Sequence, residues 1–142
     1  MEPSPAPSLA TAWRTLDSRP FGKLLGARPA SFGDGGARPE TGIREELRQR
    51  NGFLHGGVFA HAADDALTFA AGAVLGPYVL TGGFSVSYLR PATGRTLRAR
   101  AGVVHAGRRQ AVVRCGLLTL GEDGAETLCA VAQGAVPPVQ VP

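Results

Sequence analysis

The sequence predicts an α+β domain in which an antiparallel sheet wraps around one long central helix. Two features lead to this fold class. Residues 54–75 form an Ala-rich segment that is apolar on nearly every side of a helical wheel, as in a buried helix. After Gly76-Pro77 the apolar residues alternate with a period of two through four segments joined by short loops, as in consecutive antiparallel strands.

The chain of 142 residues has the size of one domain. Residues 1–7 are rich in proline and predict a disordered tail, so the domain is expected to span residues 8–142. Ser8 is suited to cap a short N-terminal helix. The apolar face of that helix would carry, at i, i+4 and i+7, the residues Leu9, Trp13 and Leu16.

Strand-like segments lie on both sides of the long helix. Two precede it, separated by the turn sequence Gly-Asp-Gly-Gly, at residues 24–32 and 37–47. The other four follow the helix, at residues 79–89, 96–105, 110–120 and 127–136. Because the loops between these four are short, we expect them to form an antiparallel meander in chain order.

Composition narrows the possible functions. Hydrophobic residues make up 44% of the chain and charged residues 18%, which excludes a disordered or fibrous protein. The net charge is +4, but the positive residues are almost all arginines scattered from Arg14 to Arg114, and Lys23 is the sole lysine. Because basic residues form no run and aromatics are not interleaved with them, the pattern argues against nucleic-acid binding. It is typical of solubility or of attraction for a small anion.

The chain shows no sign of a secreted, metal-binding or membrane protein. Cys115 and Cys129 are too few for a disulfide scaffold, and no Cys and His residues have zinc-binding spacing, so we expect free thiols in a reducing cytoplasm. The first residues lack the basic and apolar segments of a signal peptide. Residues 66–89 are uncharged and long enough to span a membrane, but glycines and a proline interrupt them.

The first candidate site is the start of the long helix. It contains the tandem glycines Gly56 and Gly57, preceded by His55. Glycines at a helix start let a ligand approach the backbone, and the unpaired N–H groups of the first turn suit a negative or developing-negative oxygen. This is the outline of an oxyanion hole. The alternative is a tight turn into the helix without a chemical role.

The second candidate is Asp64, which lies on a narrow polar stripe of the helix with His61, Asp65 and Thr68. Buried carboxylates are costly unless they have a partner or a function. Asp64 follows Gly56 by about 12 Å along the same helix, so it cannot reach an oxygen bound at that helix's N-terminus. In a two-fold dimer with antiparallel central helices, Asp64 of one chain can face Gly56 of the other.

Structural interpretations of this stripe stay open. Asp64 could belong to a solvated polar face, or bind a backbone group across a dimer. Asp65, about 100° further round the helix, suits a structural role better than a catalytic one. His61 is better suited to packing or capping than to catalysis. Thr68, one turn after Asp64, could hold a water molecule.

Three motifs point to one family. They are the run Gly52-Phe53-Leu54-His55-Gly56-Gly57, the acid Asp64, and the strand end Val86-Ser87-Tyr88-Leu89-Arg90-Pro91-Ala92-Thr93-Gly94. The sequence resembles the hotdog-fold acyl-CoA thioesterases of the phenylacetate-pathway (PaaI) type over residues 24–136. The resemblance implies a hotdog fold and hydrolysis of an acyl-CoA thioester to a carboxylic acid and coenzyme A. It also implies a cytoplasmic homodimer or homotetramer whose sites are shared between two subunits, with coenzyme A as part of the substrate and no separate cofactor.

The resemblance assigns roles to matching positions. The backbone N–H of Gly56 would polarise the thioester carbonyl, and His55 would support that turn. Gln49 stands where the family has an Asn or Gln that contacts the thioester. Asp64 of the other subunit would act as nucleophile or as general base on water, and Thr68 would position that water.

Other positions form the expected substrate-binding set, which is Gly57, Asn51, Gly82 and Gly83. Two departures from the family pattern affect the expectations. Relatives with Gln at the first position often carry Glu as the acid, whereas this chain carries Asp64, so the choice between nucleophile and base stays open. Some relatives have a serine on the strand after the helix, where this chain has Thr81-Gly82-Gly83, which leaves room for a larger acyl group.

Coenzyme A carries several phosphates, which predicts cationic contacts at the mouth of the site. The candidates are Arg90, at a strand end, and Arg108 and Arg109, in a turn. A solvated arginine is an equally good interpretation of each.

Two other functions remain as alternatives to thioester hydrolysis. One is non-catalytic binding of an acyl-CoA, against which the presence of Gln49, His55 and Asp64 argues. The other is hydration or dehydration of an acyl thioester. The hydratase pattern Asp-x-Asn-Pro-x-x-x-His is absent from the chain, which argues against this second alternative.

Overall fold

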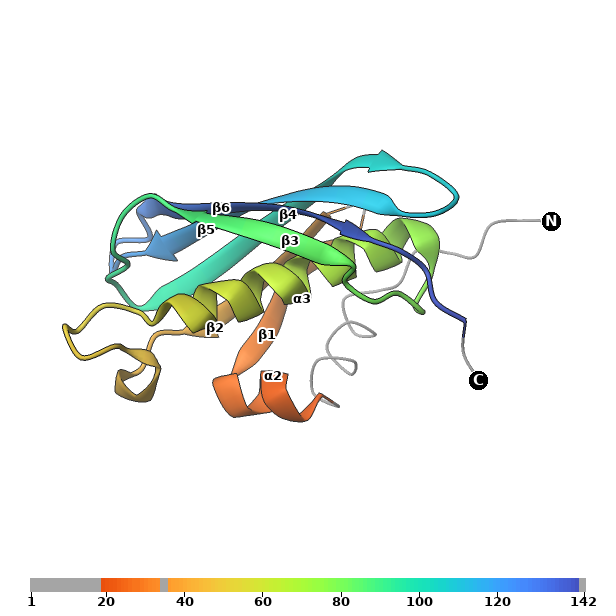
Figure 1. Ribbon diagram of the computed structural model, residues 1–142. Coiled ribbons are helices and arrows are strands. Elements are labelled where there is room, and N and C mark those ends of the chain that lie inside the picture. Colours follow the sequence, from red (N-terminus) through yellow and green to blue (C-terminus); the bar gives the residue numbers. More distant parts are fainter. Residues whose placement is uncertain (1–18, 34–35, 141–142) are drawn as a thin grey trace.

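A computed structural model describes residues 19–33 and 36–140 of the chain (Figure 1). The predicted tail and the helix that Ser8 would cap lie outside these residues. The helical elements are α2 (Pro20–Leu25), a 3₁₀ turn (Glu45–Leu47) and the long helix α3 (Gly56–Leu75). The strands are β1 (Ala27–Gly33), β2 (Gly36–Gly42), β3 (Gly83–Tyr88), β4 (Thr96–Ala106), β5 (Ala111–Leu120) and β6 (Glu126–Val136).

All six strands belong to one sheet in the order β1-β2-β4-β5-β6-β3, and every neighbouring pair is antiparallel. The helix α3 lies along one face of this sheet (Figure 1). The predicted fold class, a sheet wrapped around one long helix, is therefore confirmed.

The helix α3 is the centre of the core because the residues that it turns toward the sheet are small. Its buried side chains without solvent exposure are Ala63, Ala66, Leu67, Ala70 and Ala71. The helix is long and apolar enough to cross a membrane, but 56% of its most apolar stretch of 18 residues is buried inside the fold. Its apolar character is therefore explained by its place under the sheet.

The helix begins two residues later than the sequence predicts. Leu54 forms an isolated bridge with Arg48, and its N–H donates to the carbonyl of Ala92 at 3.2 Å. His55 has an extended backbone, with φ −65° and ψ 138°, and it caps the helix that starts at Gly56. His55 of the motif identified in the sequence therefore caps the helix and does not lie within it.

The expected meander in chain order is wrong for the strand after the helix. β3 pairs with β6, with Gly83 opposite Ala135, while β4, β5 and β6 form the meander. A Cβ on Gly134 would lie 2.5 Å from the carbonyl oxygen of Gly83 and from Cβ of Phe84, so this glycine permits the close approach. β3 is also shorter than predicted, because Val79 makes just an isolated bridge, to Pro138.

Candidate functional site

The N-terminus of α3 carries an amide that is free to bind an oxygen. The side chain of His55 accepts from the N–H of Gly57 at 2.8 Å, and the His55 carbonyl accepts from the N–H of Val58 at 3.0 Å. Within the described residues, the N–H of Gly56 has no acceptor. The expectation that His55 supports this turn agrees with the contact that it makes.

Gly56 allows an aromatic side chain to lie directly against the helix start. The hydroxyl of Tyr88 donates to the carbonyl of Gly56 at 2.9 Å, and a Cβ on Gly56 would lie 3.2 Å from that hydroxyl. The ring of Tyr88 packs edge-on against Phe59 of the same helix at 5.6 Å between centroids. Tyr88 thus fixes the position of the helix start, a role that the sequence reasoning did not assign to it.

Gln49 and Gly56 line the same hollow, of about 410 Å³, together with Arg90. The backbone N–H of Gln49 donates to the carbonyl of Phe53 at 2.8 Å, which closes the loop before the helix. The side-chain oxygen of Gln49 accepts from the backbone N–H of Asn51. The amide NH₂ of Gln49 keeps two donors for a ligand. Asn51 therefore contacts Gln49 rather than lining the hollow.

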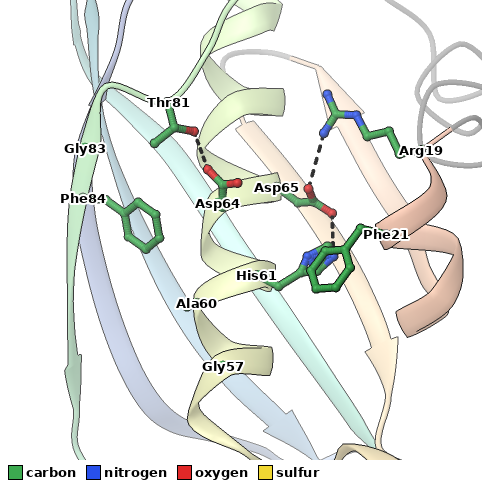
Figure 2. A pocket seen from close by; sticks show the side chains of 11 residues that line it. Arg19, Phe21, Gly57, Ala60, His61, Asp64, Asp65, Thr81, Gly83 and Phe84 are labelled. Carbon is green, nitrogen blue, oxygen red and sulfur yellow. Dashed lines mark hydrogen bonds and ion pairs between the residues drawn. The ribbon is translucent and has the colours of Figure 1, made fainter.

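Asp64 lines a different hollow, of about 600 Å³, on the side of the helix that faces the start of β3. Its carboxylate oxygen Oδ1 accepts a hydrogen bond from the hydroxyl of Thr81 (Figure 2). Gly57 and Gly83 line the same hollow. The sequence reasoning noted Thr81 as a neighbour of the tandem glycines but did not foresee that it would hold the acid.

Asp65 differs from Asp64 in its surroundings. Its side chain is 8% exposed, and its oxygens lie 3.3 Å from Nη1 of Arg19 and 3.4 Å from Nε2 of His61. Burial raises the pKa of Asp65 above its ordinary value, against the lowering effects of His61 and Arg19. These contacts agree with the structural role predicted for Asp65 and with a packed His61.

Thr68 uses its hydroxyl within the helix. Its Oγ1 lies 3.0 Å from the carbonyl oxygens of both Asp64 and Asp65, and it donates to this pair. Such back-bonding leaves the oxygen of Thr68 as an acceptor for water and removes it as a donor. Its water-positioning role stays a prediction.

The two halves of the expected site do not meet within one chain. The hollow of Gln49 and Gly56 and the hollow of Asp64 have none of their described lining residues in common. Along the helix, Gly56 and Asp64 are separated by about 12 Å. A single subunit therefore cannot place one carbonyl group against both.

The remaining predicted residues are spread over the fold. Gly82 packs on backbone, since a Cβ there would lie 3.1 Å from the carbonyl oxygen of Ala135. Arg108 and Arg109 line a third hollow, of about 660 Å³, at the turn between β4 and β5. The latter two are thus separate from Arg90, which lies beside Gln49.

The described side chains offer neither a metal site nor a reactive thiol. Within residues 19–33 and 36–140, His, Cys, Asp and Glu do not gather in any group of three that could hold a metal ion. Cys115 and Cys129 are free, as expected, and both are buried. Burial raises the pKa of the Cys115 thiol to about 12, so this thiol is not a nucleophile at neutral pH. Because Asp65 contacts Arg19 and His61, Asp64 is the carboxylate in its hollow that is available for chemistry.

Comparison with known proteins decides the family. The model of the family described as "Thioesterase superfamily" matches residues 51–125. The chain belongs to the thioesterase superfamily. The Mycobacterium tuberculosis protein named "Putative esterase MT1895" is 31% identical to this thioesterase over 138 residues, which cover 94% of the chain and 89% of that protein.

Solved structures agree with this assignment. A thioesterase family protein from Silicibacter pomeroyi is 28% identical, with a TM-score of 0.86, and the match covers 94% of the thioesterase and 100% of that chain. A variant of the phenylacetic acid degradation protein PaaI from Thermus thermophilus is 25% identical, with a TM-score of 0.75, over 85% of the thioesterase and 100% of that chain. The resemblance to the hotdog thioesterases of the PaaI type and the expected activity of a thioester hydrolase are confirmed.

Proposed function

We propose that the thioesterase hydrolyses its acyl-CoA substrate at a composite site, made by Gln49 and Gly56 of one subunit and Asp64 of a second. The separation of Gly56 from Asp64 on one helix carries this proposal. A two-fold axis that sets two α3 helices antiparallel would bring the start of one helix opposite the middle of the other, twice per dimer.

The free N–H of Gly56 would bind the thioester oxygen. This amide lies at the positive end of the helix dipole, and its strength as a donor matters most when negative charge develops on the oxygen in the transition state. The neighbouring amide of Gly57 is occupied by His55, so Gly56 is the donor that the first turn has to offer. The NH₂ of Gln49, in the same hollow as Gly56, would orient the thioester.

Asp64 would supply the reacting carboxylate. As nucleophile, it attacks the carbonyl carbon, the C–S bond breaks and coenzyme A leaves as a thiolate, and water then hydrolyses the resulting anhydride. As general base, it takes a proton from the water that attacks the carbonyl directly. In either case Thr81 holds one carboxylate oxygen, Oδ1, and the second oxygen, Oδ2, would react.

Coenzyme A would extend from the site over positively charged residues. Arg90, which lines the hollow of Gln49, would meet a phosphate of coenzyme A at the mouth of that hollow. Arg108 and Arg109 offer a second cationic position at the β4–β5 turn, suited to phosphate groups. We propose a cytoplasmic homo-oligomer that uses no cofactor beyond its substrate and binds neither nucleic acid nor membrane.

Mixing two inactive variants tests the composite site. Asp64→Ala and Gln49→Ala subunits each lose one half of every site, whereas a mixed dimer contains one intact site. Random pairing gives about half mixed dimers, so roughly a quarter of the wild-type activity should return. The control mixes Asp64→Ala with the double variant, which restores no intact site. If subunit exchange is demonstrated and activity does not return, the composite site is wrong.

A further inference from the structure

Two phenylalanines stand on either side of the hollow beside Asp64. Phe84 comes from β3, and Phe21 comes from the short helix α2 on the other side of α3 (Figure 2). Phe21 is 60% exposed, so its ring contributes little to the core. A large exposed apolar side chain that lines a hollow next to a reactive carboxylate is suited to contact a ligand.

α2 is fixed to the rest of the fold at both ends. At its start, Arg19 contacts Asp65 at 3.3 Å and lies over the ring of Phe69, 5.1 Å from the centroid. At its end, the guanidinium of Arg44 donates to the carbonyls of Leu24 and Leu25, at 2.7 and 3.0 Å. A helix of six residues has little stability of its own, so these side chains determine where it lies.

The ring of Phe21 is held in turn against α3. It packs on the ring of His61 at 4.9 Å between centroids, with 56° between the ring planes. His61 is itself fixed by its contact with Asp65. The Arg19–Asp65–His61 cluster thus places Phe21 as a wall of the hollow, packed on His61, which lies about one helical turn before Asp64 on α3.

The charges of this hollow disfavour an anionic ligand. Asp64 and Asp65 are both acidic, and the positive charge of Arg19 is already paired with Asp65. An acyl group that ends in a carboxylate would meet Asp64 without a free cation among these lining residues. An apolar acyl group, in contrast, can pack on the rings of Phe21 and Phe84.

We propose that the hollow beside Asp64 holds the acyl group of the substrate, that this group is apolar, and that Phe21 limits its length. This inference rests on the proposed function, because it places the acyl group next to Asp64. The Arg19–Asp65–His61 cluster positions the limiting side chain and does not take part in the reaction.

Binding of S-alkyl-CoA thioethers tests the limit, because these probes have no carbonyl to hydrolyse. Their dissociation constants are measured by calorimetry from butyl to dodecyl, below the micelle concentration. In the wild type, affinity should rise with chain length and then stop rising where the chain meets Phe21. In Phe21→Ala the affinity should continue to rise by about fourfold for each added methylene. The longer thioethers should then bind at least about tenfold more tightly to Phe21→Ala than to the wild type.

Two further variants sharpen the experiment. Leu24→Ala removes an equally exposed apolar side chain from the same helix that does not line the hollow, and it should keep the wild-type limit. Arg19→Met loosens α2 without touching Phe21, and it should shift the limit in the same direction as Phe21→Ala. An unchanged limit in Phe21→Ala overturns the inference. A shifted limit in a protein that hydrolyses no acyl-CoA would overturn the proposed function and leave the pocket assignment standing.

Discussion

Replacing Asp64 by Asn separates the chemical role of this side chain from its structural one. Asn has nearly the same volume, and its side-chain oxygen can still accept the hydrogen bond from Thr81. The atom that changes is the second carboxylate oxygen, which Thr81 does not hold and which becomes an NH₂ group. Both proposed roles, nucleophile and general base, need that oxygen. The substitution therefore removes the chemistry and leaves the local geometry in place.

The expected loss is at least about 10²-fold in kcat, or about 2.7 kcal/mol of transition-state stabilisation, which is the low end for a lost acid–base group. KM should change little, because the carboxylate is not needed to hold coenzyme A. The free energy of unfolding should stay within about 0.5 kcal/mol of the wild type, since the hydrogen bond to Thr81 is kept.

The assay is steady-state release of coenzyme A, followed with a thiol reagent, on a short acyl-CoA. Asp65→Asn is the matched control, because it makes the same change one residue further along the helix. Asp65 is enclosed by Arg19 and His61, so this variant should keep most of its activity on the short substrate. If Asp65→Asn is the inactive variant and Asp64→Asn turns over normally, the reacting acid has been misassigned.

Two further predictions concern binding and pH. Neutralising Arg90, Arg108 and Arg109 should raise KM for an acyl-CoA and leave kcat nearly unchanged. The same changes should have little effect on a pantetheine thioester, because that substrate lacks the nucleotide phosphates. Equal losses on both substrates would show that these arginines are structural. The raised pKa of Asp65 means that its carboxyl favours folding most below pH 3.8, its ordinary pKa, and that this contribution is lost as pH rises through the folded-state pKa. The melting temperature of Asp65→Asn, measured relative to that of the wild type, should therefore increase as pH rises from acid to neutral. A difference between the two proteins that is independent of pH would contradict the raised pKa of Asp65 as its cause.

Local sequence patterns predicted the elements of the fold but not all of their neighbours. The Ala-rich helix and the alternating strands are visible because each pattern is confined to a short stretch of chain. The pairing of β3 with β6 is not, since alternation identifies a strand without identifying its partner. Gly134 makes room for Phe84 at that pairing, but one glycine in a strand does not identify the partner strand.

In the candidate site too, local patterns predicted some residues and missed others. The capping role of His55 and the free N–H of Gly56 follow from a motif that is contiguous in sequence. Thr81 and Phe21 were not foreseen, because each reaches the hollow of Asp64 from an element that is distant along the chain. A lone threonine before two glycines and a phenylalanine after a proline carry no periodic signal that would reveal such contacts.

The alanines beneath the sheet bear on how this thioesterase could be evolved in the laboratory. Ala63 and Ala66 flank the acid on α3 and have no exposed surface, so a larger side chain at either position would lift the helix from the strands. That movement would carry Asp64 away from Thr81, which is anchored on the β3 side. Libraries that diversify the acyl preference should therefore keep these two positions constant and vary the exposed Phe21 instead.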